Sequence, residues 1–279
     1  MITKTEENSA QTPFRSGFVT IVGSPNVGKS TLLNALVGQK VAIVSDKAQT
    51  TRSRIRGIVN LPGAQMVLID TPGIQAPRNR LGQYMLHTSY DSMRDGDGIL
   101  MLLDPINGLR QRDEDILARL QKEEWLTAVL TISAQTSQGL EELLGALSSF
   151  LLPGPRFFPE DMVTDQPERV LCAEFIREAC LQMMREEIPH GIAAEIDKIE
   201  PRSDRELIDV WATVFCEREA HKRILIGSKG SMLKKIGSTS RRQMEWLFAS
   251  RVNLQLWVKV KENWRDNSRE LYSLGYHQE

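Results

Sequence analysis

Apolar and polar residues form one repeating pattern over the first half of this chain. Short runs of apolar, mostly β-branched residues alternate with longer segments of helical periodicity. Short apolar runs are typical of buried strands, and the longer segments are typical of amphipathic helices. Strands are expected at 18–22, 54–60, 65–70, 98–103 and 127–132, and helices at 29–37, 81–94, 113–122 and 140–151. This alternation predicts an α/β domain with a mostly parallel sheet and helices on both of its faces.

A second pattern follows a proline-rich stretch. Pro153, Pro155, Pro159 and Pro167 lie close together, and proline can neither continue a helix nor donate to a sheet ladder. Beyond them the order is helix, strand, strand, helix, helix, strand, which predicts a separate α+β domain. The expected bounds are 167–187, 192–200, 207–217, a short helix before residue 227, 231–249 and 251–260, with turns at 201–205 and 227–230.

The two patterns divide the chain into four parts. The expected parts are a polar, flexible tail at 1–13, a first domain at 14–152, a linker at 153–166, and a second domain with its C-terminal tail at 167–279. A length of 279 residues suits two domains that each bury a core.

The motif at residues 23–30 carries the strongest chemical signal. It reads Gly-Ser-Pro-Asn-Val-Gly-Lys-Ser, which is the phosphate-binding P-loop pattern, and it lies where a strand gives way to a helix, as that motif requires. Its glycines let successive backbone N–H groups face one anion. Lys29 is expected to reach the β- and γ-phosphates and Ser30 to hold Mg²⁺. The candidate phosphate-binding residues are Gly23, Ser24, Pro25, Asn26, Val27, Gly28, Lys29, Ser30 and Thr31.

Three further segments add candidate residues to this site. Asp70 ends a hydrophobic strand and begins Asp70-Thr71-Pro72-Gly73; in a P-loop protein such an acid holds Mg²⁺ directly or through water, and the Gly73 N–H can meet a γ-phosphate. Either Thr50 or Thr51 can offer a hydroxyl to the metal, and the sequence does not separate them. Ser133 and Ala134 follow the last expected strand of the domain, where their backbone could contact a base.

A Gly-x-x-Gly loop marks the second domain as an RNA-binding candidate. Such a loop between two helices clamps the nucleotide backbone in KH domains. The net charge of the chain is −1, yet residues 218–242 hold eight Lys or Arg and one acid, and this local basic segment favours RNA over the alternative of an ordinary solvated helix face. The candidate RNA-binding residues are Lys222, Arg223, Gly227, Ser228, Lys229, Gly230, Lys234 and Lys235.

Together, GSPNVGKS, QTTRS, DTPG and ISA resemble in their order the motifs of the translation-factor-class GTPases. Within that class the chain is similar to the Era family of bacterial ribosome-assembly GTPases, from about residue 14 to residue 260. The resemblance implies a P-loop GTPase domain joined to a type II KH domain. It implies a switch that binds and hydrolyses GTP, binds 16S ribosomal RNA near its 3′ end and assists biogenesis of the 30S subunit.

The resemblance also implies site roles and a setting. Lys29, Asn26 and Gly73 are the expected catalytic residues, and Mg²⁺ is the expected cofactor. Asn26 could also hold K⁺ near the phosphates, with a turn-forming asparagine as the alternative. Ile74 stands where Ras-like proteins have a water-positioning glutamine, so hydrolysis is expected to be slow. A monomeric, cytoplasmic protein is expected, and any contact with the inner face of the membrane is expected to be peripheral; the three cysteines have no disulfide or metal-ligand spacing.

One departure from the family pattern bears on base recognition. The chain contains no Asn-Lys-x-Asp motif, whose aspartate pairs with guanine in this class. We expect that one strand and one helix are missing, with residues 123–126 at the join, and we assign the base to no other acid, including Asp104. The alternatives are a degenerate or base-promiscuous P-loop domain that serves as a scaffold for an active KH module, and a P-loop ATPase.

Overall fold

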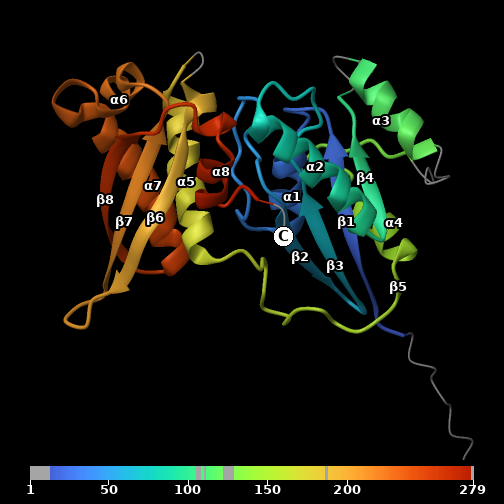
Figure 1. Cartoon of the computed structure of the whole chain (residues 1–279). Helices are drawn as coiled ribbons and strands as arrows, with labels where there is room; N and C mark the ends of the chain where they lie inside the picture. Colours follow the sequence, from blue (N-terminus) through green and yellow to red (C-terminus); the bar gives the residue numbers. More distant parts are fainter. Residues whose placement is uncertain (1–12, 105–107, 110, 122–128, 186–187, 278–279) are drawn as a thin grey trace, which may run out of the picture.

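A computed structural model describes residues 13–104, 108–109, 111–121, 129–185 and 188–277. The expected tail lies almost wholly outside these residues, as does the expected join at 123–126. The chain forms two α/β units that lie side by side, each with its own sheet (Figure 1). Within the described residues, no helix is long and apolar enough to cross a membrane.

The sheet of the first unit is built on a largely buried central strand. This strand, β1 (Arg15–Gly23), lies parallel to β3 (Ala64–Asp70) on one side and to β4 (Gly98–Leu102) on the other. β2 (Ile55–Leu61) pairs antiparallel with β3, which gives the order β2-β3-β1-β4. The short β5 (Leu152–Pro153) pairs antiparallel with the start of β1. A mostly parallel sheet is confirmed, and its parallel strands end at the edge where the P-loop begins.

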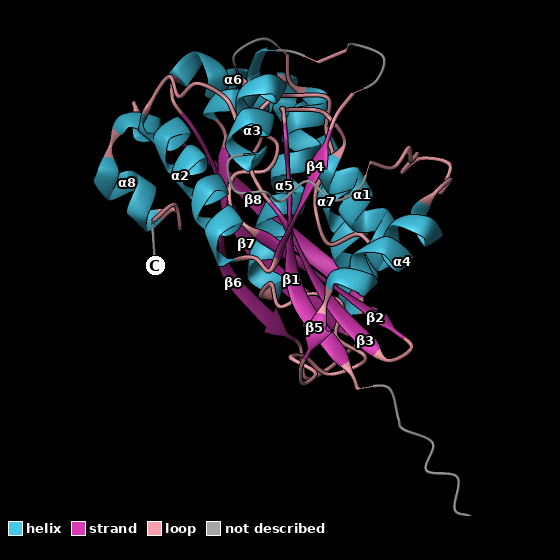
Figure 2. Cartoon of the chain, turned by 90° about the vertical axis from the view of Figure 1, so that its right-hand side faces the viewer, coloured by secondary structure: helices cyan, strands magenta, loops and turns pink. Residues whose placement is uncertain are grey.

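Helices cover both faces of this sheet, as the alternation predicts. On one face, α1 (Lys29–Val37) and α4 (Leu140–Phe150) bury Leu32, Leu36 and Leu143 against the strands. On the other face, α2 (Arg80–Asp95) and α3 (Gln111–Gln121) bury Met93 and Ile116 against Val22. Figure 2 shows the two pairs of helices on opposite sides of the sheet. The core thereby fixes the β1–α1 junction, where the P-loop lies.

The expected strand at 127–132 is wrong over the residues that the structure describes. Residues 129–132 form no strand, and Val129 and Leu130 are 84% and 41% exposed; residues 127–128 lie outside the described ranges. Only a single bridge between Ser133 and Gln138 follows. A strand offsets its backbone and side-chain entropy through a partner strand and a buried face. Residues 129–132 have no partner strand and only Ile132 packs against the core, so β4 ends the described sheet.

The second unit has the α-β-β-α-α-β order that the sequence predicts. The sheet has the order β6-β7-β8, with β6 antiparallel and β8 parallel to the central strand. Its three helices pack on one face of the sheet around a single apolar core. The elements are α5 (Glu168–Met183), β6 (Ala193–Pro201), β7 (Leu207–Cys216), α6 (Glu219–Ile226), α7 (Ser231–Phe248) and β8 (Arg251–Val260).

Two expectations for this unit differ from the structure. The first helix ends at Met183 instead of continuing toward 187, because Met184 adopts an extended conformation and closes the last turn through its N–H to Cys180. The C-terminal segment forms a further helix, α8 (Ser268–Ser273), which the periodicity did not predict because it spans only six residues. Its Asn267 cap accepts hydrogen bonds from the N–H groups of Arg269 and Glu270.

The segment between the two units follows the open edge of β2. Val163 accepts a hydrogen bond from the N–H of Ile58 at 2.9 Å, and the hydroxyl of Thr164 donates to the carbonyl of Arg56 at 2.6 Å. Arg56 also forms an ion pair with Asp165 at 2.6 Å. These contacts cover the polar groups of an edge strand, so the linker is fixed to the first unit along part of its length.

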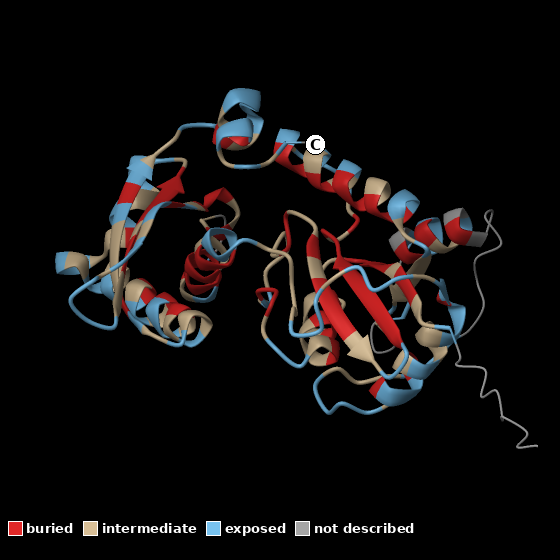
Figure 3. Cartoon of the chain, turned by 90° about the horizontal axis from the view of Figure 1, so that it is seen from below, coloured by how far each residue is buried: buried red, intermediate tan, exposed pale blue. Residues whose placement is uncertain are grey.

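The two units meet through α5, α2 and the C-terminal segment. Trp264 is fully buried among Leu81, Met85 and Leu271, so α2 of the first unit shares an apolar cluster with the end of the chain. Figure 3 shows buried residues grouped on the two sheets and on the helices beside them. Beyond its exposed first turn, α5 is buried on most sides, because the core of its own unit covers one face and the first unit covers the other.

Candidate functional site

The P-loop adopts a conformation that its glycines make possible. Gly23 and Gly28 have φ values of 149° and 102°, and a Cβ at Gly23 would lie 2.6 Å from the carbonyl oxygen of Leu102. Lys29 is buried, and its ammonium donates to the carbonyls of Gly23 and Ser24 at 3.2 and 3.0 Å. The Lys29 side chain therefore lies across the P-loop, where it is expected to contact the β- and γ-phosphates. Burial lowers the pKa of Lys29, and the Asp70 carboxylate opposes this shift.

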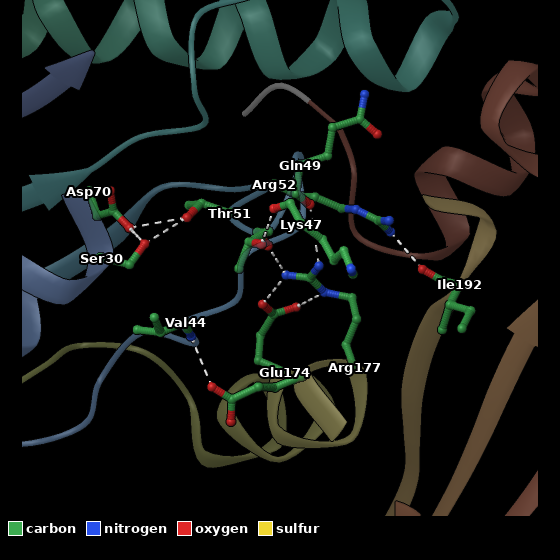
Figure 4. Close-up of polar contacts among 12 residues, drawn as sticks. Ser30, Val44, Lys47, Gln49, Thr51, Arg52, Asp70, Glu174, Arg177 and Ile192 are labelled. Carbon is green, nitrogen blue, oxygen red and sulfur yellow. Dashed lines mark hydrogen bonds and ion pairs between the residues drawn. The ribbon is translucent and has the colours of Figure 1, made fainter. Parts of the chain in front are cut away.

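Three oxygen-bearing side chains meet beside the lysine. The hydroxyl of Ser30 donates to Asp70 Oδ2 at 2.6 Å and lies 2.9 Å from the hydroxyl of Thr51, which lies 3.2 Å from the same Oδ2 (Figure 4). Burial raises the pKa of Asp70, while the Lys29 ammonium and the two hydroxyls lower it. The other carboxylate oxygen, Oδ1, is buried and has no hydrogen-bond partner among the residues described.

This cluster fits a hard divalent cation. Mg²⁺ binds oxygen ligands, and proteins commonly supply one or two carboxylates together with substrate phosphates. A buried carboxylate oxygen without a partner is costly, and a cation beside Asp70 would compensate for it. Ser30, Thr51 and Asp70 are thus the residues that could hold the metal.

The structure also separates the two candidate threonines. The hydroxyl of Thr50 donates to the carbonyl of Lys47 at 2.6 Å, whereas that of Thr51 faces Ser30 and Asp70. Both threonines lie in a loop between α1 and β2 that we call the threonine loop (residues 44–52). The metal-site cluster therefore includes Thr51, and the Thr50 hydroxyl is turned away from it.

The DTPG segment closes the other side of the P-loop. A Cβ at Gly73 would lie 2.8 Å from the Cα of Pro25, so only glycine fits here, and Ile74 donates its N–H to the carbonyl of Gly23 at 3.3 Å. The hydroxyl of Thr71 donates to the carbonyl of Ile21, and the carbonyl of Pro72 accepts from Ser89. Gly73 is therefore the member of this segment that lies directly against the P-loop.

An open pocket lies in front of these groups. Asn26 and Thr31 line it, and the Asn26 amide donates to the carbonyl of Asp46 at 2.8 Å from a left-handed backbone with a φ of 64°. Ser133 and Ala134 do not line this pocket. Ser133 pairs with Gln138, and Ala134 packs against the core beneath α4. The structure thus joins the phosphate and metal candidates, and it does not bring the two base candidates to them.

Sequence reasoning missed one polar partner of the P-loop. The hydroxyl of Ser24 donates to Asp113 Oδ1 at 2.6 Å, and both side chains are buried. Asp113 lies in the first turn of α3, 89 residues further along the chain. Because this contact depends on how α3 packs on the sheet, local sequence patterns contain no signal for it.

The RNA candidates gather around one loop of the second unit. Gly227, Lys229 and Gly230 have φ values of 72°, 50° and 79°, and a Cβ at Gly227 would lie 2.8 Å from the N atom of Met232. The loop joins α6 to α7 and presents the side chains of Ser228 and Lys229. Arg223, Lys234 and Lys235 are exposed on the flanking helices, and Lys222 is half-buried. The predicted basic residues therefore lie in and beside one loop with a sharply bent backbone.

Buried charged residues between the two units were also missed. Arg52 is buried and donates to the carbonyls of Ile192 and His190 at 2.7 and 3.0 Å, with its guanidinium 5.7 Å from the centre of the Trp264 ring. Arg177 and Glu178 of α5 are buried, and both contact the threonine loop; Figure 4 labels Arg177 beside this loop. The available signal was the presence of charged residues within the apolar pattern of the helix at 167–187.

Comparison with known families matches both units. Residues 18–132 match the model of the 50S ribosome-binding GTPase family, and residues 187–265 match the KH domain. GTPase Era of Clostridioides difficile is 42% identical over 294 positions that cover 95% of this chain and 99% of that protein. GTPase Era of Alkaliphilus metalliredigens is 40% identical over 94% of this chain and 99% of that protein.

Solved structures extend this likeness to the arrangement of both units. A structure of Era in complex with MgGDPNP and nucleotides 1506–1542 of 16S ribosomal RNA superposes with a TM-score of 0.89 at 37% identity, covering 95% of this chain and all of that one. An Aquifex aeolicus Era variant bound to GDP.AlF4- gives the same values. The alignment with the Clostridioides protein spans 294 positions although this chain has 279 residues, so at least 15 residues of that relative have no counterpart here.

Proposed function

The chain belongs to the Era family of GTPases, and we propose that it is a GTP-hydrolysing switch that binds 16S ribosomal RNA through its KH domain and assists assembly of the 30S subunit in the cytoplasm. The observation that carries this proposal is the cluster of Ser30, Thr51 and Asp70 beside Lys29. A degenerate scaffold would have no need to keep these groups together at a buried site, so the cluster favours an active enzyme over the scaffold alternative.

The residues that line the pocket support a phosphate site in front of the P-loop. Residues of the P-loop and the start of α1 line the pocket, where their backbone N–H groups would favour an anion. Lys29 would exchange its bonds to loop carbonyls for phosphate oxygens, and Gly73 would offer its N–H to the γ-phosphate. Ser30, Thr51 and Asp70 would hold Mg²⁺, which neutralises charge on the β- and γ-phosphates. A water molecule would then attack the γ-phosphate in line with the leaving oxygen.

At the position after DTPG, the described part of the chain has no polar side chain that would orient that water. Ile74 is buried and apolar where a glutamine would be needed, so hydrolysis should be slow and rest on Lys29 and the loop amides. We propose that K⁺ adds charge near the phosphates beside Asn26. The contact of the Asn26 amide with the Asp46 carbonyl keeps the alternative open, in which Asn26 serves the turn.

Guanine selection is the part of the proposed function that the sequence supports least. The sequence lacks Asn-Lys-x-Asp, and Ser133 and Ala134 offer backbone contacts only. We propose that GTP binds mainly through its phosphates and that ATP competes better than in relatives with the full motif.

The RNA half would use the loop at Gly227–Gly230 and the basic residues beside it. Glycines at both ends allow a nucleotide backbone to approach closely, and Lys229 would contact a phosphate. The solved Era complex contains nucleotides 1506–1542 of 16S ribosomal RNA, and we propose the corresponding segment as the ligand here.

One pair of titrations tests the proposal. Fluorescent GTP and fluorescent ATP are titrated against the full chain with Mg²⁺, and a labelled RNA with the 3′ end of 16S ribosomal RNA is titrated in parallel. We expect GTP binding, slow release of phosphate and RNA binding. Absence of nucleotide binding together with normal RNA binding would leave the scaffold function.

A further inference from the structure

Two neighbouring charges of the KH domain are buried where a core helix should be apolar. Arg177 and Glu178 on α5 are each only 1% exposed. Burying a charge is costly unless opposite charges or hydrogen bonds compensate for it. Their partners therefore indicate what the two side chains are for.

Arg177 is compensated by one residue of its own helix and by the first domain. Its Nε donates to Glu174 Oε1 at 2.8 Å, and the two side chains form an ion pair. The remaining donors reach the threonine loop, where Arg177 donates to the carbonyl of Thr50 and lies 3.5 Å from that of Gln49. A planar guanidinium with several donors can hold a carboxylate and two carbonyls at once.

Glu178 holds the other end of the same loop. Its Oε1 accepts the N–H of Val44 at 2.9 Å, and its Oε2 accepts from Lys40 and from Gln243 at 2.7 Å. One turn of α5 therefore contacts the threonine loop at both of its ends, and Figure 4 labels Val44 and Arg177 at these two contacts.

Thr51 lies between two arginine contacts that link the domains. Before it, Arg177 holds the carbonyls of Gln49 and Thr50; after it, Arg52 donates to the backbone of Ile192 and His190 in the KH domain. Gln49 has a φ of 62°, a conformation that costs free energy for a residue with a side chain and persists only where its surroundings impose it. The Thr51 hydroxyl between these contacts faces Ser30 and Asp70.

We propose that Arg177 is a positioning residue for GTP hydrolysis: the KH domain completes the metal site in cis by holding the threonine loop so that the Thr51 hydroxyl faces Ser30 and Asp70. Arg177 does not line the pocket in front of the P-loop, and it acts through the backbone of Gln49 and Thr50. The inference rests on the proposed function, in which Ser30, Thr51 and Asp70 hold Mg²⁺.

The test compares Arg177→Gln, Arg177→Lys and the control Arg185→Gln in the full chain. Arg185 is an exposed arginine just beyond the end of α5. Three quantities are measured: affinity for a non-hydrolysable GTP analogue as Mg²⁺ is varied, hydrolysis over the same Mg²⁺ range, and hydrogen exchange of residues 44–52. Affinity for the 16S fragment reports whether the KH domain remains folded.

For Arg177→Gln, the Mg²⁺ concentration that gives half-maximal analogue binding and half-maximal hydrolysis should rise about tenfold. This is the usual cost of removing a group that supports a metal ligand. Exchange of residues 44–52 should accelerate, while RNA affinity stays at the wild-type value. Arg177→Lys should shift in the same direction by less, because one ammonium keeps the ion pair with Glu174 but cannot hold both carbonyls. The lysine variant also gives a result if Arg177→Gln does not fold.

A Mg²⁺ dependence of Arg177→Gln or Arg177→Lys equal to that of Arg185→Gln would overturn the inference and leave the proposed function standing. Faster hydrolysis in either variant would also overturn it, because the contact would then restrain the site. A wild-type chain that hydrolyses no GTP at any Mg²⁺ concentration would overturn the proposed function and this inference together.

Discussion

The hydroxyl of Thr51 lies 2.9 Å from the hydroxyl of Ser30, although the two residues are 21 positions apart in the chain. The contact joins the first residue after the P-loop lysine to a loop that also contacts the other domain. It separates two adjacent threonines that look equivalent in the sequence. The nucleotide site and the interface between the domains therefore share one short segment of backbone.

This geometry predicts different effects at Thr50 and Thr51. Thr51→Ala removes a hydroxyl from the cluster with Ser30 and Asp70, and GTP hydrolysis should fall by at least about tenfold with a raised Mg²⁺ requirement. Thr50→Ala is the matched control, because that hydroxyl donates to the carbonyl of Lys47, and its rate should stay within about threefold of wild type. Steady-state phosphate release at several Mg²⁺ concentrations measures both; equal reductions in the two variants would contradict the assignment.

Local sequence patterns predicted most elements but not the contacts between distant segments. The helix after the P-loop has the bounds that periodicity and its flanking glycines predict, and the strand at 251–260 has the bounds that its residue pattern predicts. The run at 127–132 has the composition of a strand, yet residues 129–132 form none, because strand formation depends on a partner. Arg177 and Asp113 lie far in sequence from the segments that they contact, so their roles follow only from the packing.

The missing base motif predicts weak discrimination between nucleotides. A site that hydrogen-bonds a base edge rejects an analogue without the matching groups by about 10⁴- to 10⁵-fold. Without Asn-Lys-x-Asp, we expect ATP to displace fluorescent GTP at a concentration at most about a hundredfold higher than the concentration of unlabelled GTP that displaces it. Competition titrations with Mg²⁺ measure the ratio, and fluorescent GDP, which has no γ-phosphate, serves as a control for the contribution of that group. Rejection of ATP by about 10⁴-fold or more would mean that other residues read the base.

Asn26 predicts a dependence on the monovalent cation. If K⁺ adds positive charge near the β- and γ-phosphates, hydrolysis in K⁺ buffer should exceed that in Na⁺ buffer by about tenfold, or about 1.4 kcal/mol in the barrier. The variant Asn26→Asp addresses the turn-forming role, because aspartate also tolerates a left-handed backbone and should therefore keep the turn. Equal rates in the two buffers at constant ionic strength would favour the purely turn-forming role.

The three thiols should be unreactive in the folded protein. Cys172, Cys180 and Cys216 are free and buried, and burial raises the pKa of Cys172 and Cys180 to about 12. Because the thiolate is the reactive form, only about one Cys180 in 10⁴ is ionised at about pH 8. We expect no labelling by Ellman's reagent at that pH until denaturant unfolds the KH domain. Rapid labelling of the native chain would show that the core around α5 opens readily.

The basic loop predicts a specific change in salt dependence. Lys229 and Lys235 lie at and beside the Gly227–Gly230 bend and are exposed. On single-stranded RNA, each phosphate that the protein no longer neutralises reduces the slope of log K against log salt by about 0.7. The double variant with Lys229→Ala and Lys235→Ala should therefore bind the 16S fragment more weakly, with a slope lower by about 1.4. Lys198→Ala on β6 is the control, because Lys198 pairs with Glu200 on the same strand. A double variant that binds more weakly at an unchanged slope would mean that neither lysine neutralises a phosphate and that the weaker binding comes from altered folding of the loop.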